Sequence, residues 1–281
     1  MKIINNYQNF SSLDKTYVTI GTFDGVHYGH KKILQKLVNE ARACGKKSVL
    51  LTFFPHPRMV LQKDAKIELI NTIDEKAALL ERLGLDYLII HPFSKEFSRT
   101  TALEFVRDVL VNQLNISKLI IGYDHHFGKN REGNIDQLTE YSLLYDFNVK
   151  EISAQDIDDV SVSSTKIRKA LHSGNLKAAN QFLGYNFMLN GKVVNGKQLG
   201  GKIGYPTANL QVKEDYKLIP KTGVYVVKSK FNNETLFGMM NIGNRPTVSG
   251  EHQTIEIHFF DFDKDLYEKR IQIDILHRLR D

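Results

Sequence analysis

The sequence predicts two domains: an N-terminal doubly wound α/β domain with a parallel sheet, and a C-terminal all-β domain built as an antiparallel barrel or sandwich. Up to about residue 184, short apolar runs alternate with amphipathic runs, which is typical of buried strands alternating with helices. Beyond that point, glycines and polar turns separate strand-like runs, and helical patterns almost vanish. The 281 residues also exceed one average domain. We therefore expect domains at 1–184 and 185–281.

The predicted strands of the first domain are Tyr17–Gly21, Ser48–Phe54, Tyr87–Pro92, Lys118–Gly122 and Val149–Ile152. The predicted helices are Lys31–Ala43, Ile73–Leu83, Thr101–Leu114 and Ile135–Tyr145, followed by a helical pair at Ser164–Ser173 and Leu176–Leu183. The predicted strands of the second domain are Asn186–Val194, Gly223–Lys230, Thr235–Ile242, Thr254–Phe260 and Arg270–Ile275. Because ligands bind beyond the carboxyl ends of the strands in open α/β sheets, the loops at those ends are candidate sites.

The composition narrows the class of protein. A formal net charge of +6 suits nucleotide and phosphate ligands, but the charge is too diffuse to indicate a nucleic acid partner. The single cysteine, Cys44, excludes a disulfide framework and a cysteine-based zinc site, and it fits a reducing cytoplasm. The N-terminus lacks the apolar core of a signal peptide, and no apolar run approaches the ~20 residues of a membrane span. We expect a cytoplasmic protein with no membrane partner.

The strongest local signal is the run GTFDGVHYGH at residues 21–30, which follows a predicted strand and opens a predicted helix. A strand-to-helix turn points free backbone N–H groups and the positive end of the helix dipole at an anion. Gly25 and Gly29 let the backbone approach a phosphate. His27 and His30 are three residues apart, so both can face one site. A capped helix with two surface histidines is the alternative interpretation.

This segment resembles the His-x-Gly-His nucleotidyltransferases, which transfer a nucleotidyl group from a nucleoside triphosphate and release pyrophosphate. The resemblance implies that His27 and His30 are catalytic and stabilise the pentacoordinate phosphate. It also implies phosphate contacts from their neighbours Phe23, Asp24, Gly25 and Gly29. No covalent intermediate is implied, because positioning and charge stabilisation would carry the catalysis.

Three further segments narrow the family. The run TFFPHP at residues 52–57 places two prolines and a histidine at a strand exit, which predicts a rigid, ligand-facing corner. Residues 122–133, GYDHHFGKNREG, follow another strand, with Asp124 as an acceptor for a ring or ribose group and a basic loop suited to phosphates. Residues 162–168, VSSTKIR, begin a helix whose hydroxyls either cap it or join Arg168 in cradling a triphosphate.

In this order, the four segments resemble the FMN adenylyltransferase module of bacterial FAD synthetases, over roughly residues 14–184. The resemblance implies a flavin site that includes Phe54, Pro55, His56 and Asp124. It also implies ATP or phosphate contacts from Ser163, Ser164, Thr165 and Arg168. These roles come from the resemblance, and the local chemistry is compatible with them.

The second domain contains GGKIGYPTANL at residues 200–210, which is not a Walker A loop. Thr207 and Asn209 alternate by two, so on a strand their side chains face one side. Their neutral oxygens can share Mg²⁺ with ATP phosphates, since magnesium prefers oxygen ligands. The backbone from Gly200 to Gly204 and the side chain of Lys202 can steady those phosphates. A turn that enters a strand is the alternative for Pro-Thr-Ala-Asn alone.

Together with GVYVV at 223–227, NIGNRPT at 241–247 and IEIHFFDFD at 255–263, this run resembles the riboflavin kinase module over roughly residues 185–281. The resemblance implies a small antiparallel β-barrel in which Thr207 and Asn209 bind Mg-ATP. It also implies that Glu256 contacts the flavin and acts as general base on the ribityl hydroxyl. Because Glu256 alternates with Ile255 and Ile257, we expect it to point into the mouth of the barrel.

We therefore expect a bifunctional transferase of flavin biosynthesis that uses Mg²⁺, with ATP as co-substrate. Its kinase module would convert riboflavin and ATP to FMN and ADP, and its adenylyltransferase module would convert FMN and ATP to FAD and pyrophosphate. One alternative is a nucleotidyltransferase with another mononucleotide-type acceptor. Another is a flavin-binding protein with an impaired kinase module, because the chain stops at Asp281 where relatives usually continue into a C-terminal helix.

Overall fold

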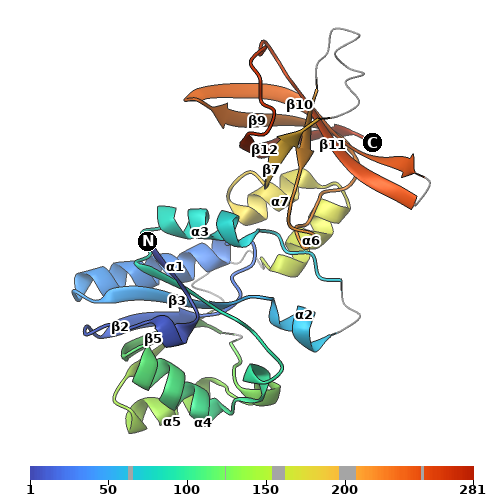
Figure 1. Ribbon diagram of the computed structural model, residues 1–281. Helices are drawn as coiled ribbons and strands as arrows, with labels where there is room; N and C mark the ends of the chain where they lie inside the picture. The colour runs from blue at the N-terminus through green and yellow to red at the C-terminus, as the bar shows by residue number, and fades with distance from the viewer. Residues whose placement is uncertain (63–65, 124, 154–161, 196–206, 248–249) are drawn as a thin grey trace. The chain divides into compact units, whose positions relative to one another are not determined.

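The computed structural model describes residues 1–62, 66–123, 125–153, 162–195, 207–247 and 250–281. The chain forms two compact units (Figure 1). The first unit comprises Met1–Ile67 and Ile73–Ser161, and the second comprises Glu68–Thr72 and Val162–Asp281. Each unit has a hydrophobic core that consists of its own buried side chains.

The first unit is built on a six-stranded sheet in the order β1-β4-β3-β2-β5-β6. Its strands are β1 (Lys2–Asn5), β2 (Thr16–Ile20), β3 (Lys47–Phe53), β4 (Tyr87–His91), β5 (Ile116–Gly122) and β6 (Asn148–Ile152). All neighbouring strands in this order are parallel. Val49, Leu50 and Leu51 in β3 are fully buried, so the central part of the sheet is covered on both faces.

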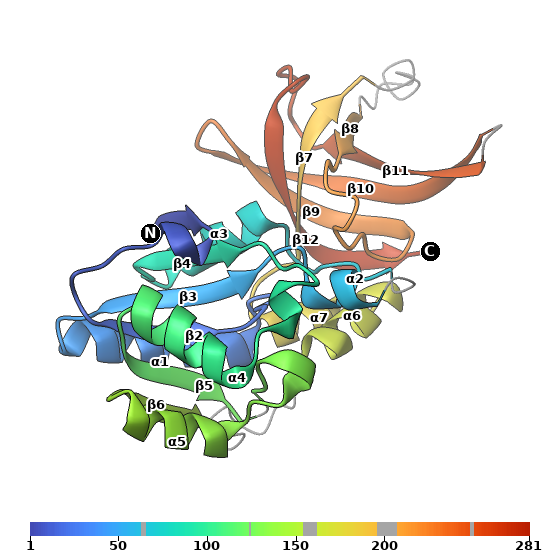
Figure 2. The same cartoon turned by 60° about the horizontal axis from the view of Figure 1, so that its bottom comes forward.

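Helices cover both faces of this sheet and make it doubly wound. They are α1 (Tyr28–Ala43), α2 (Pro57–Leu61), α3 (Ile73–Arg82), α4 (Ala102–Glu104) and α5 (Ile135–Leu144), with the π-helix η3 (Phe105–Gln113) and the short 3-10 helices η1 (Tyr7–Asn9), η2 (Phe97–Arg99) and η4 (Lys129–Arg131). Figure 1 shows α1 and α3 on one face and α4 and α5 on the other, and Figure 2 turns α4 and α5 toward the viewer. Among the described residues of the chain, no helix is long and apolar enough to cross a membrane. The α/β prediction for this part of the chain is confirmed.

Two elements of this unit differ from the sequence-based expectation. The pattern does not predict the edge strand β1, because this strand has only 4 residues and Ile3 is about half exposed. The helix expected at 101–114 begins with a capping box between Thr101 and Glu104, but after one turn it continues as the π-helix η3. Its buried side chains keep an approximately helical spacing, which is why the pattern predicts an α-helix; they are Phe105, Val106, Val109 and Leu110.

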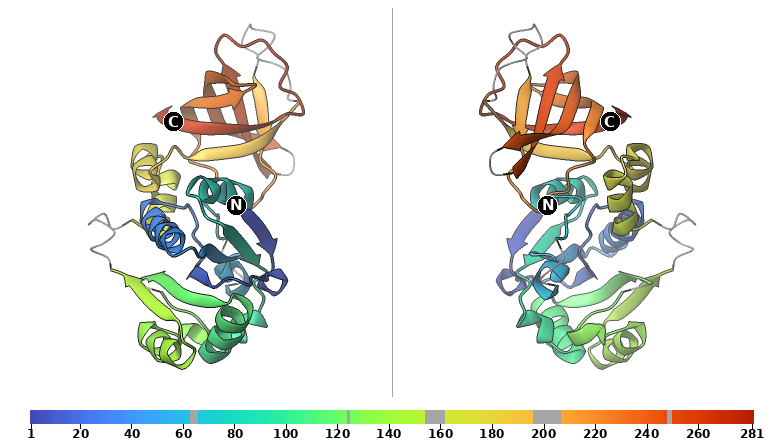
Figure 3. Two further views of the ribbon diagram at one scale, coloured as in Figure 1. Left: turned by 90° about the vertical axis from the view of Figure 1, so that its left-hand side faces the viewer. Right: turned by 90° about the vertical axis from the view of Figure 1, so that its right-hand side faces the viewer.

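The second unit contains a closed barrel in the order β10-β11-β8-β7-β12-β9. Its strands are β7 (Met188–Val194), β8 (Ala208–Gln211), β9 (Gly223–Phe231), β10 (Glu234–Thr247), β11 (Gly250–Phe259) and β12 (Arg270–Arg280). The paired strands are antiparallel, and Figure 3 shows the barrel from two sides. Along β9, Tyr225, Val227 and Ser229 are buried and alternate with partly exposed residues, so one face of the strand fills the interior. The expectation of an antiparallel barrel is confirmed.

The helices α6 (Ser164–His172) and α7 (Leu176–Leu183) belong to this second unit. Leu171 of α6 shares a hydrophobic core with Tyr225 of the barrel. The backbone N–H of Lys221 also donates to the carbonyl oxygen of Leu171 at 3.1 Å. The expected boundary between the two functional modules, at residues 184 and 185, lies after these helices and stays a prediction.

Candidate active sites

The first candidate site is the loop of residues 21–27, the histidine loop, which joins β2 to α1. Phe23 and Val26 have φ angles of 45° and 36°, which residues with a side chain rarely adopt and which are especially unfavourable for a β-branched one. Gly21 and Gly25 also have positive φ angles, of 157° and 89°. These angles turn the chain sharply from the end of the strand into the first turn of α1, where Gly29 is buried. The loop therefore carries backbone strain at the point where the sequence predicts phosphate binding.

His27 and His30 lie together at the start of α1. His27 is the N-cap, and its Nδ1 accepts from the backbone N–H of His30 at 3.4 Å, so the helix begins at Tyr28, before the expected Lys31. The two imidazole rings stack with centroids 3.6 Å apart and planes inclined by 16°. Phe23 packs against His30 with a centroid separation of 4.7 Å. The Nδ1 atom of His30 is buried and has no hydrogen-bond partner within the described residues.

Both histidines are neutral at pH 7. Burial lowers the pKa of His27 to about 4, while the charge of Asp24 opposes this shift and that of Lys31 adds to it. Burial, His27 and Lys76 together lower the pKa of His30 well below 6.5. Because Nδ1 of the neutral His27 accepts a hydrogen bond, its proton is on Nε2. The histidine loop thus offers uncharged N–H donors beside the positive end of α1.

A cavity of about 630 Å³ adjoins the histidine loop, beyond the carboxyl ends of β2 and β3. Its apolar walls are mostly aromatic and include Phe53, Phe93, Phe97, Phe105 and Phe127. The polar side chains that line it include His56, Arg58, His125, His126 and Arg131. The rings of Phe53 and Phe93 meet edge to face, with centroids 5.8 Å apart and planes inclined by 73°. An apolar cavity with a few polar groups fits a planar aromatic ligand.

The residues expected to contact a flavin do not all line the aromatic cavity. His56 lines the aromatic cavity, and its side chain caps the short helix α2. Phe54 and Pro55 are not among the described residues that line the cavity. Phe54 instead ties two strand ends together, because its N–H donates to the carbonyl oxygen of His91 at 3.1 Å. Asp124 lies outside the described residues.

The aromatic walls of this cavity are not among the residues that the sequence predicts. Phe53 ends β3, Phe93 follows the end of β4 by two residues, and Phe127 lies in the loop after β5. An aromatic residue at or after the end of several strands is the signal that would reveal such a wall, because the ends of parallel strands meet at one edge of the sheet. Lys76 is also missed, since a lysine in an amphipathic helix predicts a solvent-facing position.

The run expected to cradle a triphosphate begins α6 in the second unit. Ser163 is the N-cap of this helix, and its Oγ accepts from the backbone N–H of Lys166 at 3.3 Å. The capping interpretation therefore holds for this hydroxyl. Arg168 donates through Nε to the carbonyl oxygen of Glu68 at 2.8 Å. A triphosphate contact at Ser163, Arg168 and the two residues that follow Ser163 stays a prediction.

Glu256 lies in β11 between two asparagines of neighbouring strands. Its register partners are Asn209 in β8 and Asn241 in β10. Because directly opposite residues of antiparallel strands point to the same face, the three polar side chains form a row. Ile255 and Ile257, which flank Glu256, are buried in the core. The expectation that Glu256 points into the barrel mouth is therefore wrong: apolar side chains fill the interior, and Glu256 belongs to the outer face.

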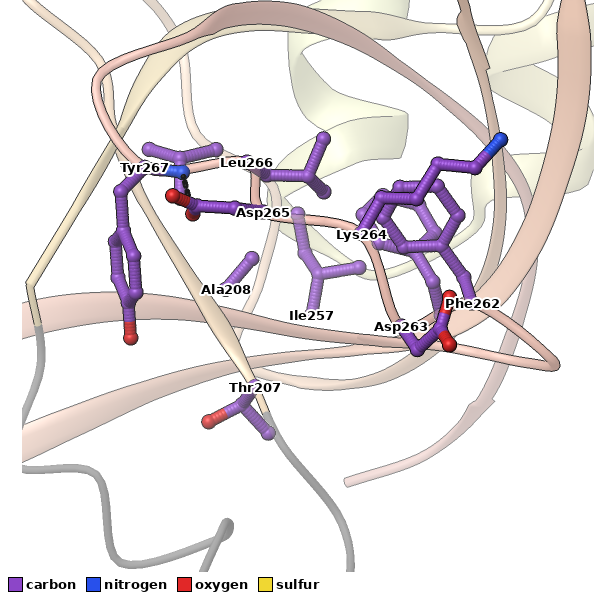
Figure 4. Close-up of a pocket in the computed structure, with 11 residues that line it drawn as sticks. Thr207, Ala208, Ile257, Phe262, Asp263, Lys264, Asp265, Leu266 and Tyr267 are labelled. Atoms are coloured by element: carbon purple, nitrogen blue, oxygen red, sulfur yellow. Dashed lines mark hydrogen bonds between the residues drawn. The ribbon is translucent and has the colours of Figure 1, made fainter.

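Thr207 lines a second cavity, of about 360 Å³, in the barrel unit (Figure 4). Ala208, Ile257 and Leu266 belong to its apolar walls, and the segment 262–267 also lines it. Figure 4 shows Thr207 at the edge of this cavity, with its hydroxyl directed away from Leu266. The residues expected to steady the phosphates, Gly200, Lys202 and Gly204, lie outside the described part of the chain.

The side chains expected to hold Mg²⁺ present the right donor atoms. Thr207 offers a hydroxyl and Asn209 an amide oxygen, and the carboxylate of Glu256, the expected general base, is a further oxygen donor beside them. Asn209 and Glu256 are register partners on adjacent strands, which brings their side chains next to each other. Magnesium prefers oxygen ligands and takes part of its coordination shell from water and from substrate phosphates. These residues therefore fit a magnesium ion that is shared with ATP.

Two family models match this chain, in the same order as the two modules that the sequence predicts. The family model described as FAD synthetase matches residues 9–166, and the one described as riboflavin kinase matches residues 183–281. The crystal structure of a protein described as a macrolide-efflux protein from Streptococcus pneumoniae is also similar, with a TM-score of 0.90 and 30% identity, and covers 99% of this chain and 91% of that chain. The fold, the histidine loop and the two family matches define a two-domain transferase of flavin nucleotides.

Two bifunctional riboflavin kinase/FMN adenylyltransferases, from Buchnera aphidicola subsp. Schizaphis graminum and Escherichia coli K12, are each 35% identical to this chain over 100% of its length and over 91% and 90% of their own. The chain belongs to the bifunctional riboflavin kinase/FMN adenylyltransferase family. The family member from Listeria monocytogenes is 36% identical over 91% of this chain and 81% of its own length. The protein is accordingly a transferase with both activities and uses ATP as co-substrate.

Proposed function

We propose that the two activities divide between modules at residues 1–184 and 185–281. The second module converts riboflavin and ATP to FMN and ADP, and the first converts FMN and ATP to FAD and pyrophosphate. One observation carries this division: the histidine loop, which leads into the stacked, neutral His27 and His30, contributes Gly21 and Thr22 to the lining of an aromatic cavity of about 630 Å³ at the edge of the parallel sheet. Joining a flavin mononucleotide to an adenylyl group requires two neighbouring sites. One offers hydrogen-bond donors to the phosphates, and the other holds a planar ring.

In the adenylyl transfer, the phosphate of FMN attacks the α-phosphorus of ATP and pyrophosphate leaves. The flavin ring occupies the aromatic cavity, and the FMN phosphate lies where this cavity meets the histidine loop. Nε2–H of His27, the His30 ring and the backbone N–H groups at the start of α1 donate to the oxygens on which charge grows in the transition state. The side chains proposed to hold the triphosphate are Ser163, Ser164, Thr165 and Arg168.

In the kinase reaction, Glu256 accepts the proton of the ribityl hydroxyl as that oxygen attacks the γ-phosphorus of ATP and ADP leaves. Its place on the outer face of the barrel, beside Asn209, supports this role because the base and a predicted ATP contact are neighbours there. Thr207 and Asn209 hold the phosphates of ATP together with the glycine-rich run that precedes them.

We propose Mg²⁺ as the metal of the kinase site, held by Thr207 and Asn209. When bound, Mg²⁺ offsets the negative charge of the ATP phosphates. The oxygen donors of these two side chains and the adjacent carboxylate of Glu256 support this assignment.

We also propose that the protein works in the cytoplasm. Its one cysteine, Cys44, is exposed and free, which is typical of a reducing compartment. Its proposed substrates and products are the small molecules riboflavin, FMN, ATP and FAD.

Incubation of the purified protein with riboflavin, ATP and MgCl₂, followed by chromatographic separation of the flavins over time, tests this proposal. The expected result is a transient rise of FMN followed by FAD. FAD formed only when FMN is supplied would contradict the kinase assignment. FMN that accumulates without conversion to FAD would contradict the adenylyltransferase assignment.

A further inference from the structure

Lys76 is a buried charge that the chemistry above does not use. It lies near the start of α3, and only 4% of its surface is exposed. Its Nζ donates to the carbonyl oxygen of Thr22, in the histidine loop, at 2.6 Å. Burial of an ammonium group is unfavourable unless the group is paired. A buried lysine that reaches a loop carbonyl therefore suggests that the loop needs this contact.

The carbonyl oxygen of Thr22 is held from two sides. Thr52 at the end of β3 also donates to it through Oγ1, at 3.3 Å. The bond from Lys76 is the stronger of the two because its donor is charged. The residues that follow include Phe23 and Val26, with φ angles of 45° and 36°. Strained backbone of this kind persists only where the surrounding structure holds it in place.

The charge of Lys76 acts on the groups that face it from the loop and from α1. Burial lowers the pKa of Lys76 to about 8, and the charge of Asp24, itself buried, opposes that shift. Lys76 in turn helps to lower the pKa of His30, after burial and His27. Glu75, its neighbour in α3, is buried as well. At pH 7 Lys76 is therefore charged, and its charge favours the neutral form of His30.

We propose that Lys76 is a positioning residue for the adenylyl transfer: it holds the carbonyl oxygen of Thr22 and so fixes the strained loop that aims His27 and His30 at the phosphates. This inference rests on the proposed adenylyl transfer at the histidine loop. Lys76 acts through Thr22 and contacts no substrate. Loss of the Lys76 side chain therefore lowers kcat, whereas FMN still binds to the aromatic walls of the cavity.

The test compares Lys76→Met with Lys118→Met in the full-length chain. Lys118 lies in β5 of the same unit and donates to Glu40 at 2.7 Å, so the control removes another paired lysine away from the loop. Misplacement of reacting groups by about 1 Å costs roughly 100-fold in rate, so we expect a loss of that size in kcat for FMN-to-FAD conversion by Lys76→Met. The KM for FMN and the rate of FMN formation from riboflavin should stay within about threefold of wild type. Lys118→Met should leave all three quantities unchanged.

Lys76→Arg separates positioning from a general loss of stability. It keeps a charged donor at this position, so its rate of FMN-to-FAD conversion should be at least about tenfold higher than that of Lys76→Met. The pH profile provides a second readout. The wild-type FMN-to-FAD rate should fall as the pH rises through about 8, where Lys76 loses its proton. The Lys76→Arg rate should not fall there, because arginine stays charged.

An FMN-to-FAD rate of Lys76→Met within about threefold of wild type would overturn the inference, and so would Lys76→Arg no faster than Lys76→Met. If Lys76→Met shows no unfolding transition for the first unit, Lys76→Gln is tested in its place under the same criteria. The neutral side chain of glutamine is one atom shorter than that of lysine. If the wild-type protein makes no FAD from FMN, the proposed function fails and the inference fails with it. That result differs from a loss confined to Lys76 variants.

Discussion

Asn209 and Glu256 are register partners across β8 and β11, so an amide and a carboxylate lie side by side on the outer face of the barrel. Asn241 of β10 continues this row on the other side of Glu256. The carboxylate faces away from the interior, because the neighbouring Ile255 and Ile257 are buried there. The kinase chemistry that we propose therefore takes place on a wall of the barrel, outside its core.

Replacement of Asn209 by alanine should weaken the use of ATP in FMN formation. Loss of one ligand atom to Mg-ATP should raise the KM for ATP by roughly tenfold, or about 1.4 kcal/mol, and leave FMN-to-FAD conversion unchanged. Initial rates at varied ATP concentration measure this effect. Gln211→Ala is the matched control, since Gln211 is exposed two residues further along β8. Equal effects of the two substitutions would contradict the role of Asn209.

The buried histidines should make the first unit less stable in mild acid. His27 has a pKa of about 4 in the folded chain against 6.5 for the unaffected side chain. The unfolded chain therefore binds more protons between these values, so stability falls as the pH falls through 6.5 and levels off below about 4. At pH 5 the loss from His27 alone is on the order of 2 kcal/mol. Burial shifts the pKa of His91 in the same direction, to about 4.

Urea unfolding at pH 7 and pH 5 measures this dependence. His27→Asn should unfold with a smaller difference between the two pH values than wild type. His277→Asn serves as the control, because His277 is exposed in β12, and it should keep the wild-type difference. A pH dependence of His27→Asn equal to that of wild type would show that His27 is not buried in its neutral form.

The aromatic wall should set the affinity for FMN. Phe97 lines the cavity and packs against Phe53, with ring centroids 5.7 Å apart. Phe97→Ala removes one ring contact with the flavin, so it should raise the KM for FMN by roughly threefold to tenfold and leave FMN formation from riboflavin unchanged. Leu143→Ala, in the same unit at a residue that is 83% exposed, is the control. An unchanged KM for FMN in Phe97→Ala would place the flavin elsewhere.

The sequence predicts those parts of the fold and of the sites that depend on local pattern. Ten consecutive residues, 21–30, contain the glycines and both histidines of the first candidate site, and their position between a predicted strand and a predicted helix indicates a phosphate site. The alternation of apolar and amphipathic runs likewise predicts the parallel sheet, because buried strands and amphipathic helices have different periods. The edge strand β1 is not predicted by this pattern, since it is short and half exposed.

Features assembled from distant segments could not be predicted in the same way. Phe53, Phe93 and Phe97 form one wall only because β3 and β4 are adjacent and parallel. Lys76 has the sequence signature of a solvent-facing helix residue, and its burial depends on how α3 packs over the histidine loop. The alternation around Glu256 shows that it faces away from Ile257, but closure of the barrel decides which face becomes the interior.

The division of chemistry between Glu256 and His30 is the central claim, and one crossed measurement tests it most directly. The rates of FMN formation from riboflavin and of FAD formation from FMN are measured for wild type, Glu256→Gln and His30→Ala, with the exposed Glu234→Gln as control. Glu256→Gln should lower FMN formation by at least about 100-fold and spare FAD formation from FMN, since it removes a general base. His30→Ala should do the reverse, with a loss of roughly 100-fold or more. Loss of both reactions, or of neither, in either folded variant would contradict the account.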